Sequence, residues 1–171
     1  MAIDSLNALF VEELKDLLSA EKQITRALPK MIKAATSPEL QTAFEDHLTL
    51  TERHIERLDQ VFGRLGLEPQ EKPCEGMAGL LKEGDQLLKE AMAPSVKDAA
   101  LISAAQRVEH YEMAVYGSLR TYAQLLGDIE TAQILQQTLD EEGDADRKLT
   151  QLAEFSINLQ AAEADMEEVE S

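Results

Sequence analysis

The sequence predicts an all-α protein, a four-helix bundle with one long crossover connection that carries a short fifth helix. Four long segments place apolar residues at alternating spacings of three and four, which is the period of a helix face buried in a bundle. Only eight Gly and five Pro occur among the 171 residues, so the long segments are seldom interrupted. Very short turns separate the helices of each pair, whereas about 30 residues join one pair to the other.

The first two helices are expected over residues 4–35 and 38–65. Ser37 can accept a hydrogen bond from the first turn of the second helix, and Pro38 suits that turn because its fixed φ is already helical. The apolar face of the first helix comprises Leu14, Leu17, Glu21, Ile24, Leu28 and Met31. The corresponding face of the second comprises Leu40, Phe44, His47, Thr51, His54, Leu58, Val61 and Leu65.

The connection begins at Gly66, which ends the second helix, and contains a short helix expected over residues 76–91. Pro94 interrupts the chain again, and Ser95 with Asp98 resembles a capping box for the third long helix. Gly127 and the residue after it stop that helix and start the fourth, which is expected to end near residue 159. We therefore expect a bundle domain over residues 1–160 and an acidic C-terminal tail over residues 161–171.

Composition excludes several classes of function. The formal net charge of −17 argues against binding to nucleic acid or to anionic lipid, because like charges repel. No run of about 18 apolar residues is present to span a membrane. The N-terminus lacks the basic and apolar regions of a signal peptide, and the single cysteine, Cys74, suits a reducing compartment, so a cytoplasmic location is expected.

Four polar residues occupy positions where the buried face of a helix calls for an apolar one: Glu21, His54, Glu112 and Glu142. A carboxylate inside a bundle is unfavourable unless a basic partner or a metal ion compensates its charge. The apolar faces of the four helices contain no Lys or Arg. A metal ion is therefore the leading explanation.

The short turns bring these residues to one level of the bundle. Glu21 and His54 lie at similar distances from the turn near Ser37, and Glu112 and Glu142 lie at equal distances from Gly127. Glu109 and Asp146 fall on nearly the same helix faces, one turn away. The predicted metal site comprises Glu21, His54, Glu109, Glu112, Glu142 and Asp146. Two divalent ions would almost cancel its five carboxylate charges, and an oxygen-rich set suits iron or manganese better than structural zinc.

Three segments of the chain resemble those of the bacterial ferritin-like stress proteins of the YciE/YciF type. They read SAEKQ, VEHYE and TLDEE and cover residues 19–23, 108–112 and 138–142. The resemblance extends from about residue 5 to residue 159. It implies a ferritin-like bundle with an extra helix, a homodimer and a link to the stress response.

More distantly, the chain resembles rubrerythrin, whose di-iron site is built from carboxylates and histidines of four helices. The positions that match this pattern are Glu21, His54, Glu109, Glu112 and Glu142. The chain departs from it at Thr51, where a carboxylate is expected, and at Asp146, where a histidine is expected.

Three functions remain open from the sequence. The first is a ferritin-like di-metal protein that reacts with oxygen or peroxide, which would make it a di-iron oxidoreductase. The second is a non-enzymatic stress protein whose metal site is structural, degenerate or empty, and the third is a metal-free interaction module with a proton-sharing acidic cavity. His47 is interpreted as a structural core histidine, and His110 as exposed.

Overall fold

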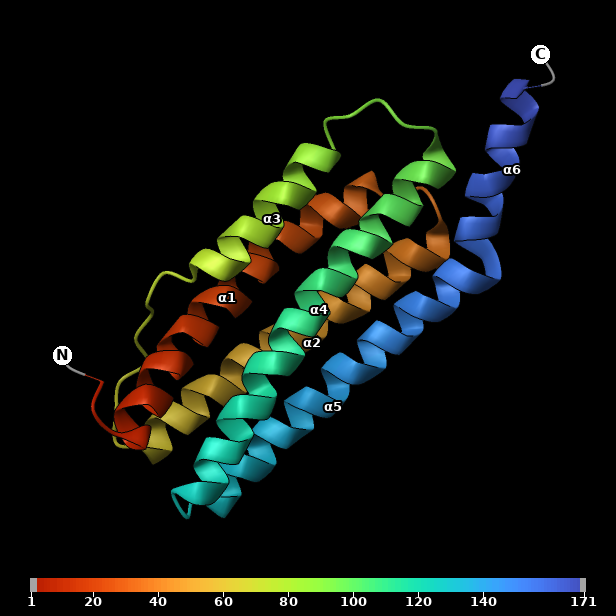
Figure 1. Cartoon of the computed structure of the whole chain (residues 1–171). Helices are drawn as coiled ribbons and strands as arrows, with labels where there is room; N and C mark the ends of the chain where they lie inside the picture. The colour runs from red at the N-terminus through yellow and green to blue at the C-terminus, as the bar shows by residue number, and fades with distance from the viewer. Residues whose placement is uncertain (1–2, 170–171) are drawn as a thin grey trace.

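The protein is a bundle of long helices, described here from a computed structural model that places the backbone of residues 3–169 and the side chains of residues 3–163 (Figure 1). The described residues form helices and no strand. In chain order the elements are α1 (Leu6–Ala34), α2 (Pro38–Arg64), α3 (Glu75–Leu87), α4 (Pro94–Leu125), α5 (Ile129–Leu152), the π-helical η1 (Ala153–Ile157) and α6 (Asn158–Val169). The predicted all-α bundle is confirmed.

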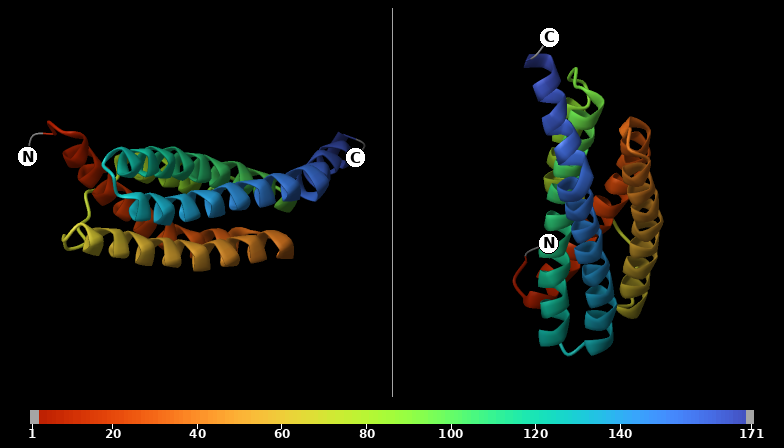
Figure 2. Two further views of the ribbon diagram at one scale, coloured as in Figure 1. Left: turned by 90° about the horizontal axis from the view of Figure 1, so that it is seen from below. Right: turned by 90° about the vertical axis from the view of Figure 1, so that its right-hand side faces the viewer.

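The crossover connection is confirmed as well. Helices α1 and α2 form one antiparallel hairpin, α4 and α5 form the other, α1 packs beside α4, and α2 packs beside α5 (Figures 1 and 2). The connection runs back along the bundle, and its helix α3 packs against α1 and α4. Because of this return, α2 and α4 run in the same direction. Simple up-and-down winding would have made them antiparallel.

The turns follow the predicted chemistry. The hydroxyl of Ser37 accepts a hydrogen bond from the backbone N–H of Leu40 at 3.3 Å, and Pro38 occupies the first turn of α2. Gly66 and Gly127 end α2 and α4 with φ of 69° and 82°, a left-handed conformation that side chains with a Cβ rarely adopt.

The predicted capping box at the start of α4 is wrong. The N-cap is Ala93, with no side-chain hydrogen bond, and Pro94 starts the helix. The carboxylate of Asp98 instead accepts hydrogen bonds from the backbone N–H groups of Thr36 and Ser37, at 2.7 and 2.8 Å, and from the Thr36 hydroxyl. Asp98 therefore ties the end of the crossover to the α1–α2 turn.

The helical chain continues past the predicted end of the fourth helix. Through the π-helical turn of η1 the chain passes into α6, which remains helical to Val169 and extends beyond the bundle (Figure 1). Phe155, in η1, is 79% exposed. Most of the predicted acidic tail is thus part of α6, and its last two residues, Glu170 and Ser171, lie outside the described residues.

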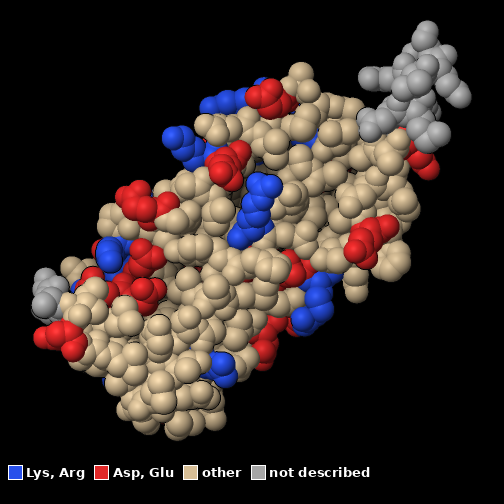
Figure 3. Space-filling view, in the orientation of Figure 1, with Lys and Arg blue, Asp and Glu red and all other residues tan. Residues whose placement is uncertain are grey.

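Acidic and basic side chains are interspersed on the face shown in Figure 3. Many of the acids pair with neighbouring bases, as Glu71 does with Lys22 at 2.7 Å and Asp46 with Lys148 at 2.7 Å. Within the described part of the chain, no helix combines the length and the apolar character needed to cross a membrane.

Candidate metal centre

Five of the six predicted site residues meet in the core of the bundle. Each of the four long helices contributes at least one of them, and none is more than 2% exposed. They are Glu21 from α1, His54 from α2, Glu109 and Glu112 from α4, and Glu142 from α5. Together with His47 they form two groups that could each hold a cation: Glu21, His54 and Glu142 on one side, and His47, Glu109, Glu112 and Glu142 on the other. Ligand atoms within each group lie within 4.8 Å of one another, and Glu142 belongs to both groups.

The first group, which we call the His54 half, is held by a close set of contacts. His54 Nδ1 lies 2.9 Å from Glu142 Oε1 and 3.6 Å from Glu21 Oε1. The buried hydroxyl of Tyr116 donates a hydrogen bond to Glu21 Oε1. These contacts fix the orientation of both carboxylates before any cation binds.

A second layer of residues orients the imidazole of His54. His54 Nε2 lies 2.9 Å from Glu141 Oε2, and Arg57 donates two hydrogen bonds to the same carboxylate, at 2.6 and 2.8 Å. When Nε2–H donates to Glu141, the lone pair of Nδ1 is directed to the cluster, and this is how outer carboxylates orient histidine ligands of metals. Burial opposes the charged imidazole, but the carboxylates of Glu142 and Glu21 outweigh it and raise the pKa of His54.

The second group, which we call the His47 half, includes a residue that sequence reasoning assigned elsewhere. His47 is buried, and its Nε2 lies 3.3 Å from Glu109 Oε1. Neither ring nitrogen has a hydrogen-bond partner, and burial lowers the pKa of the imidazole. A core histidine with a purely structural role would normally have its ring nitrogens satisfied. His47 therefore joins the candidate ligands, beside its predicted structural role.

Asp146 does not join either group. Its Oδ1 accepts a hydrogen bond from Gln106 Nε2 at 3.1 Å and lies 3.3 Å from Nε2 of His110, whose side chain is exposed as expected. Thr51, where the rubrerythrin pattern has a carboxylate, donates its hydroxyl to the backbone oxygen of His47 at 2.9 Å. Neither Thr51 nor Asp146 thus places a donor atom in the cluster, whereas His47 places a ring nitrogen there.

The donor set fits a cation because its polar atoms lack partners inside the protein. Among the described residues, the buried atoms without a hydrogen-bond partner include one oxygen each of Glu21 and Glu109, both oxygens of Glu112 and Glu142, both ring nitrogens of His47 and Nδ1 of His54. Buried polar groups nearly always have a hydrogen-bond partner in native proteins. A cluster with this many unpartnered polar atoms therefore requires an explanation. Divalent cations would satisfy the carboxylate oxygens and one ring nitrogen of each imidazole.

Without a cation, the cluster must hold protons. Burial raises the pKa of Glu21 to about 7, and burial together with the charges of neighbouring carboxylates raises the pKa values of Glu109 and Glu112 well above the ordinary range. Burial also disfavours ionised Glu142, but the contacts from His54 and Glu109 outweigh it and lower its pKa to about 2. The metal-free cluster therefore favours an ionised Glu142 and protonated Glu109 and Glu112.

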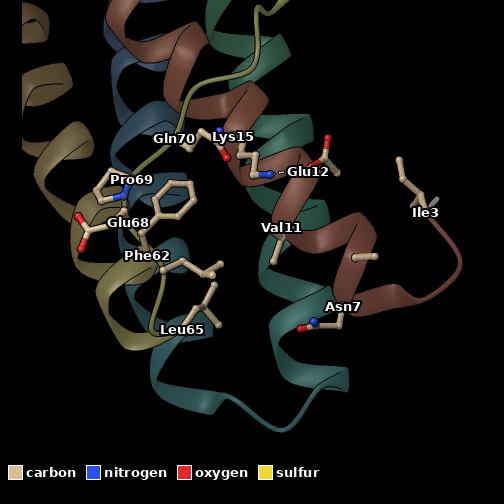
Figure 4. Close-up of a pocket in the computed structure, with 12 residues that line it drawn as sticks. Ile3, Asn7, Val11, Glu12, Lys15, Phe62, Leu65, Glu68, Pro69 and Gln70 are labelled. Atoms are coloured by element: carbon tan, nitrogen blue, oxygen red, sulfur yellow. Dashed lines mark hydrogen bonds and ion pairs between the residues drawn. The ribbon is translucent and has the colours of Figure 1, made fainter. Parts of the chain in front are cut away.

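The pocket with the greatest volume among the described residues does not coincide with the carboxylate and histidine cluster. It measures about 710 Å³ and lies between the start of α1 and the α2–α3 connection, and it shares no residue with the cluster (Figure 4). Its walls include Val11, Phe62 and Leu65, and its charged residues Glu12 and Lys15 pair with each other at 2.9 Å. Glu68 is the other carboxylate of its wall, and among the described residues no group of three or more candidate metal ligands lies here.

The residues that sequence reasoning missed are His47, Arg57 and Glu141. Arg57 and Glu141 lie beside the apolar faces of their helices, where periodicity predicts partial exposure. The sequence could have placed His47 in the cluster if the parallel run of α2 and α4 had been taken into account. Position 47 then lies level with 109, and position 54 with 116; the first pair is in contact, and the rings of His54 and Tyr116 lie 6.3 Å apart.

Comparison with known proteins agrees with this fold. A family described as a domain of unknown function (DUF892) matches residues 5–162. Protein YciF of Escherichia coli is 43% identical over 162 residues, which cover 94% of this chain and 98% of YciF. The crystal structure described as that of the E. coli stress protein YciF is similar over 91% of this chain and 99% of that one, with a TM-score of 0.88.

Two further solved structures are similar. A protein of Rhodopseudomonas palustris named YcfI is 42% identical, with a TM-score of 0.85 over 88% of this chain and 97% of that one. A protein of Xanthomonas campestris, 20% identical, shares the fold with a TM-score of 0.77 over 95% of this chain and 99% of that one. The chain belongs to the DUF892 family.

Proposed function

We propose that this member of the DUF892 family binds two divalent metal ions, iron or manganese, in the core of its helical bundle. One observation carries the proposal: four buried carboxylates and two buried histidines form two adjacent groups that share Glu142, and most of their polar atoms have no partner in the protein. Oxygen-rich ligation with one imidazole in each group suits iron or manganese.

Each ligand has a distinct part in this arrangement. Glu142 would help to hold both ions, because it is the member common to both groups. His54 and Glu21 would hold one ion, and His47, Glu109 and Glu112 the other. Arg57 and Glu141 orient His54, and Tyr116 orients Glu21, so the first ion meets ligands that are already in place. Bound iron would supply Lewis acidity and electrons for a reaction with oxygen or peroxide.

A second candidate function is metal binding without turnover. It is favoured by Thr51 and Asp146, because neither supplies the ligand that the rubrerythrin pattern has at its position. In this case metal raises the melting temperature by binding only the folded state, and neither oxygen nor peroxide is consumed. Oxygen and peroxide consumption by the iron-loaded protein distinguishes the two functions. The family resemblance also supports a homodimer. Analytical ultracentrifugation of the purified protein measures its oligomeric state.

Elemental analysis of the Glu142→Gln variant tests the proposal. We expect two ions per chain in the parent protein, and loss of both in the variant, because the amide removes the charge that the two groups share. The matched control is Asp140→Asn on the same helix, an exposed residue two positions away, which should bind metal like the parent. Equal metal content in the parent and in Glu142→Gln would contradict the proposal.

A further inference from the structure

A cavity of about 220 Å³ lies between α2 and α5 and opens beside the His47 half of the cluster. Its walls are largely apolar and include Phe44 and Leu50 of α2, and Ala145 and Leu149 of α5. His47 and Glu109 also line it, whereas His54, Glu21 and Glu112 do not. The cavity therefore reaches only one of the two halves.

Two polar residues of the cavity wall, His47 and Glu109, are buried and have polar atoms without a partner. His47 is 6% exposed and Glu109 is 2% exposed. Both ring nitrogens of His47 and one carboxylate oxygen of Glu109 lack a hydrogen-bond partner. A ligand with a single hydroxyl group would find both donors and acceptors at this place, because a hydroxyl can donate and accept.

The charged residues that line the cavity are already paired. Asp46 binds Lys148 at 2.7 Å, Glu141 binds Arg57, and Asp144 binds Arg147. Glu109, the remaining carboxylate of the wall, is buried and lies 3.3 Å from His47 Nε2. None of these groups offers an exposed, uncompensated charge to a ligand. A charged molecule would lose its hydration in the apolar part of the cavity without gaining an ionic partner, so an uncharged molecule is favoured.

We propose that this cavity binds a small uncharged organic molecule that has an apolar body and one hydroxyl group. The size is sufficient, since apolar cavities of roughly 150 Å³ take up benzene. The apolar body would contact Phe44, Leu50 and Leu149, and the hydroxyl would meet His47 and Glu109. This site goes beyond the proposed metal centre and does not depend on it, although the ligand would lie next to an ion held by the His47 half.

Calorimetric titration of phenol into the chelator-treated full chain tests this site. We expect saturable binding in the parent, and Ala145→Leu should weaken it at least about tenfold, because the added side chain fills the cavity. The matched control is Ala114→Leu on α4, at an exposed position that lines none of the described cavities, and it should bind phenol within about twofold of the parent. Benzoate and benzylammonium, which keep the phenyl ring but carry a charged group in place of the hydroxyl, should bind at least about tenfold more weakly.

Three results would overturn the inference: no phenol binding in the parent, undiminished binding in Ala145→Leu, or equally tight binding of either charged compound. Should Ala145→Leu fail to fold, Leu50→Phe narrows the same cavity from the opposite helix and serves in its place. Because these titrations use metal-free protein, their outcome is separate from that of the metal analysis. If both proposals hold, the Ala145→Leu variant should lose phenol binding and still bind metal like the parent protein.

Discussion

The His54 half and the His47 half of the cluster share Glu142 but differ in how the protein holds them. In the His54 half, Arg57 and Glu141 fix the imidazole and Tyr116 fixes Glu21. In the His47 half the imidazole has no hydrogen-bond partner and lies against a cavity. One half is therefore preorganised and enclosed, whereas the other is less constrained and accessible.

In the proposed metal site, this difference would give the two halves different tasks. Ligands that are already oriented bind an ion more tightly, because less conformational entropy is lost on binding. An accessible half can accept or exchange a ligand from outside. We therefore expect the two ions to differ in affinity, with the tighter one in the His54 half.

Replacement of each histidine gives the largest expected effects. His54→Ala should weaken binding of the tighter ion about 100-fold or more, because it removes a ligand and leaves Glu141 without its imidazole partner. His47→Ala should retain the tighter ion and lose the weaker one. Competition titration with a chelator measures both affinities. Indistinguishable titration curves for the two variants would refute the asymmetry.

Removal of the outer layer should have the next largest effect. Arg57→Met frees Glu141 and loosens His54, so the affinity for the tighter ion should fall about tenfold or more while that for the weaker ion changes little. Arg53→Met on the same helix, at an exposed position, is the matched control. An equal loss of affinity in both variants would mean that overall charge, and not orientation of His54, sets the affinity.

The metal-free protein should be more stable in mild acid. Burial raises the pKa values of Glu21, Glu109 and Glu112, so the folded state holds more protons than the unfolded chain as pH rises from about 4.5 to 7 and above. Stability from these groups is complete below the unfolded pKa and is lost as pH rises through the folded one. The raised pKa of His54 adds to this trend, and the lowered pKa of His47 opposes it.

Thermal melts in chelator measure this dependence. The melting temperature should be at least about 4 °C higher at pH 5.5 than at pH 8, since about 1 kcal/mol corresponds to roughly 2–4 °C for a chain of this size. Saturating metal should reverse the trend, because ligands must lose protons to bind it. A metal-free melting temperature that increases from pH 5.5 to pH 8 would contradict the raised pKa values, because it requires the folded state to hold fewer protons than the unfolded chain.

The smallest effect is expected at Asp146, which lies outside both halves. Asp146→Asn should change the affinity for either ion by less than about twofold, because the carboxylate contacts Gln106 and His110 and belongs to neither group. The same chelator competition measures it. If Asp146→Asn lost one bound ion, Asp146 would be a metal ligand, as its sequence position suggested.

Much of the arrangement could be predicted from the sequence because helix geometry is regular. The period of 3.6 residues places Glu21, His54, Glu112 and Glu142 on buried faces, and short turns fix the level at which antiparallel partners meet. The start of α4 was less predictable. Ser95 and Asp98 have the spacing of a capping box, but Asp98 forms stronger contacts with Thr36 and Ser37, which are distant in sequence.

The sequence by itself determined the helices, the crossover and the positions where carboxylates enter the core. The tertiary structure alone decided that His47 belongs to the cluster and Asp146 does not. His47 and His54 lie two turns, about 10 Å, apart on α2. Only the parallel run of α2 and α4 brings Glu109 level with His47, while Gln106 and His110 hold Asp146 at the edge. A periodic pattern fixes which face a residue occupies, but its partners depend on which helix packs against that face.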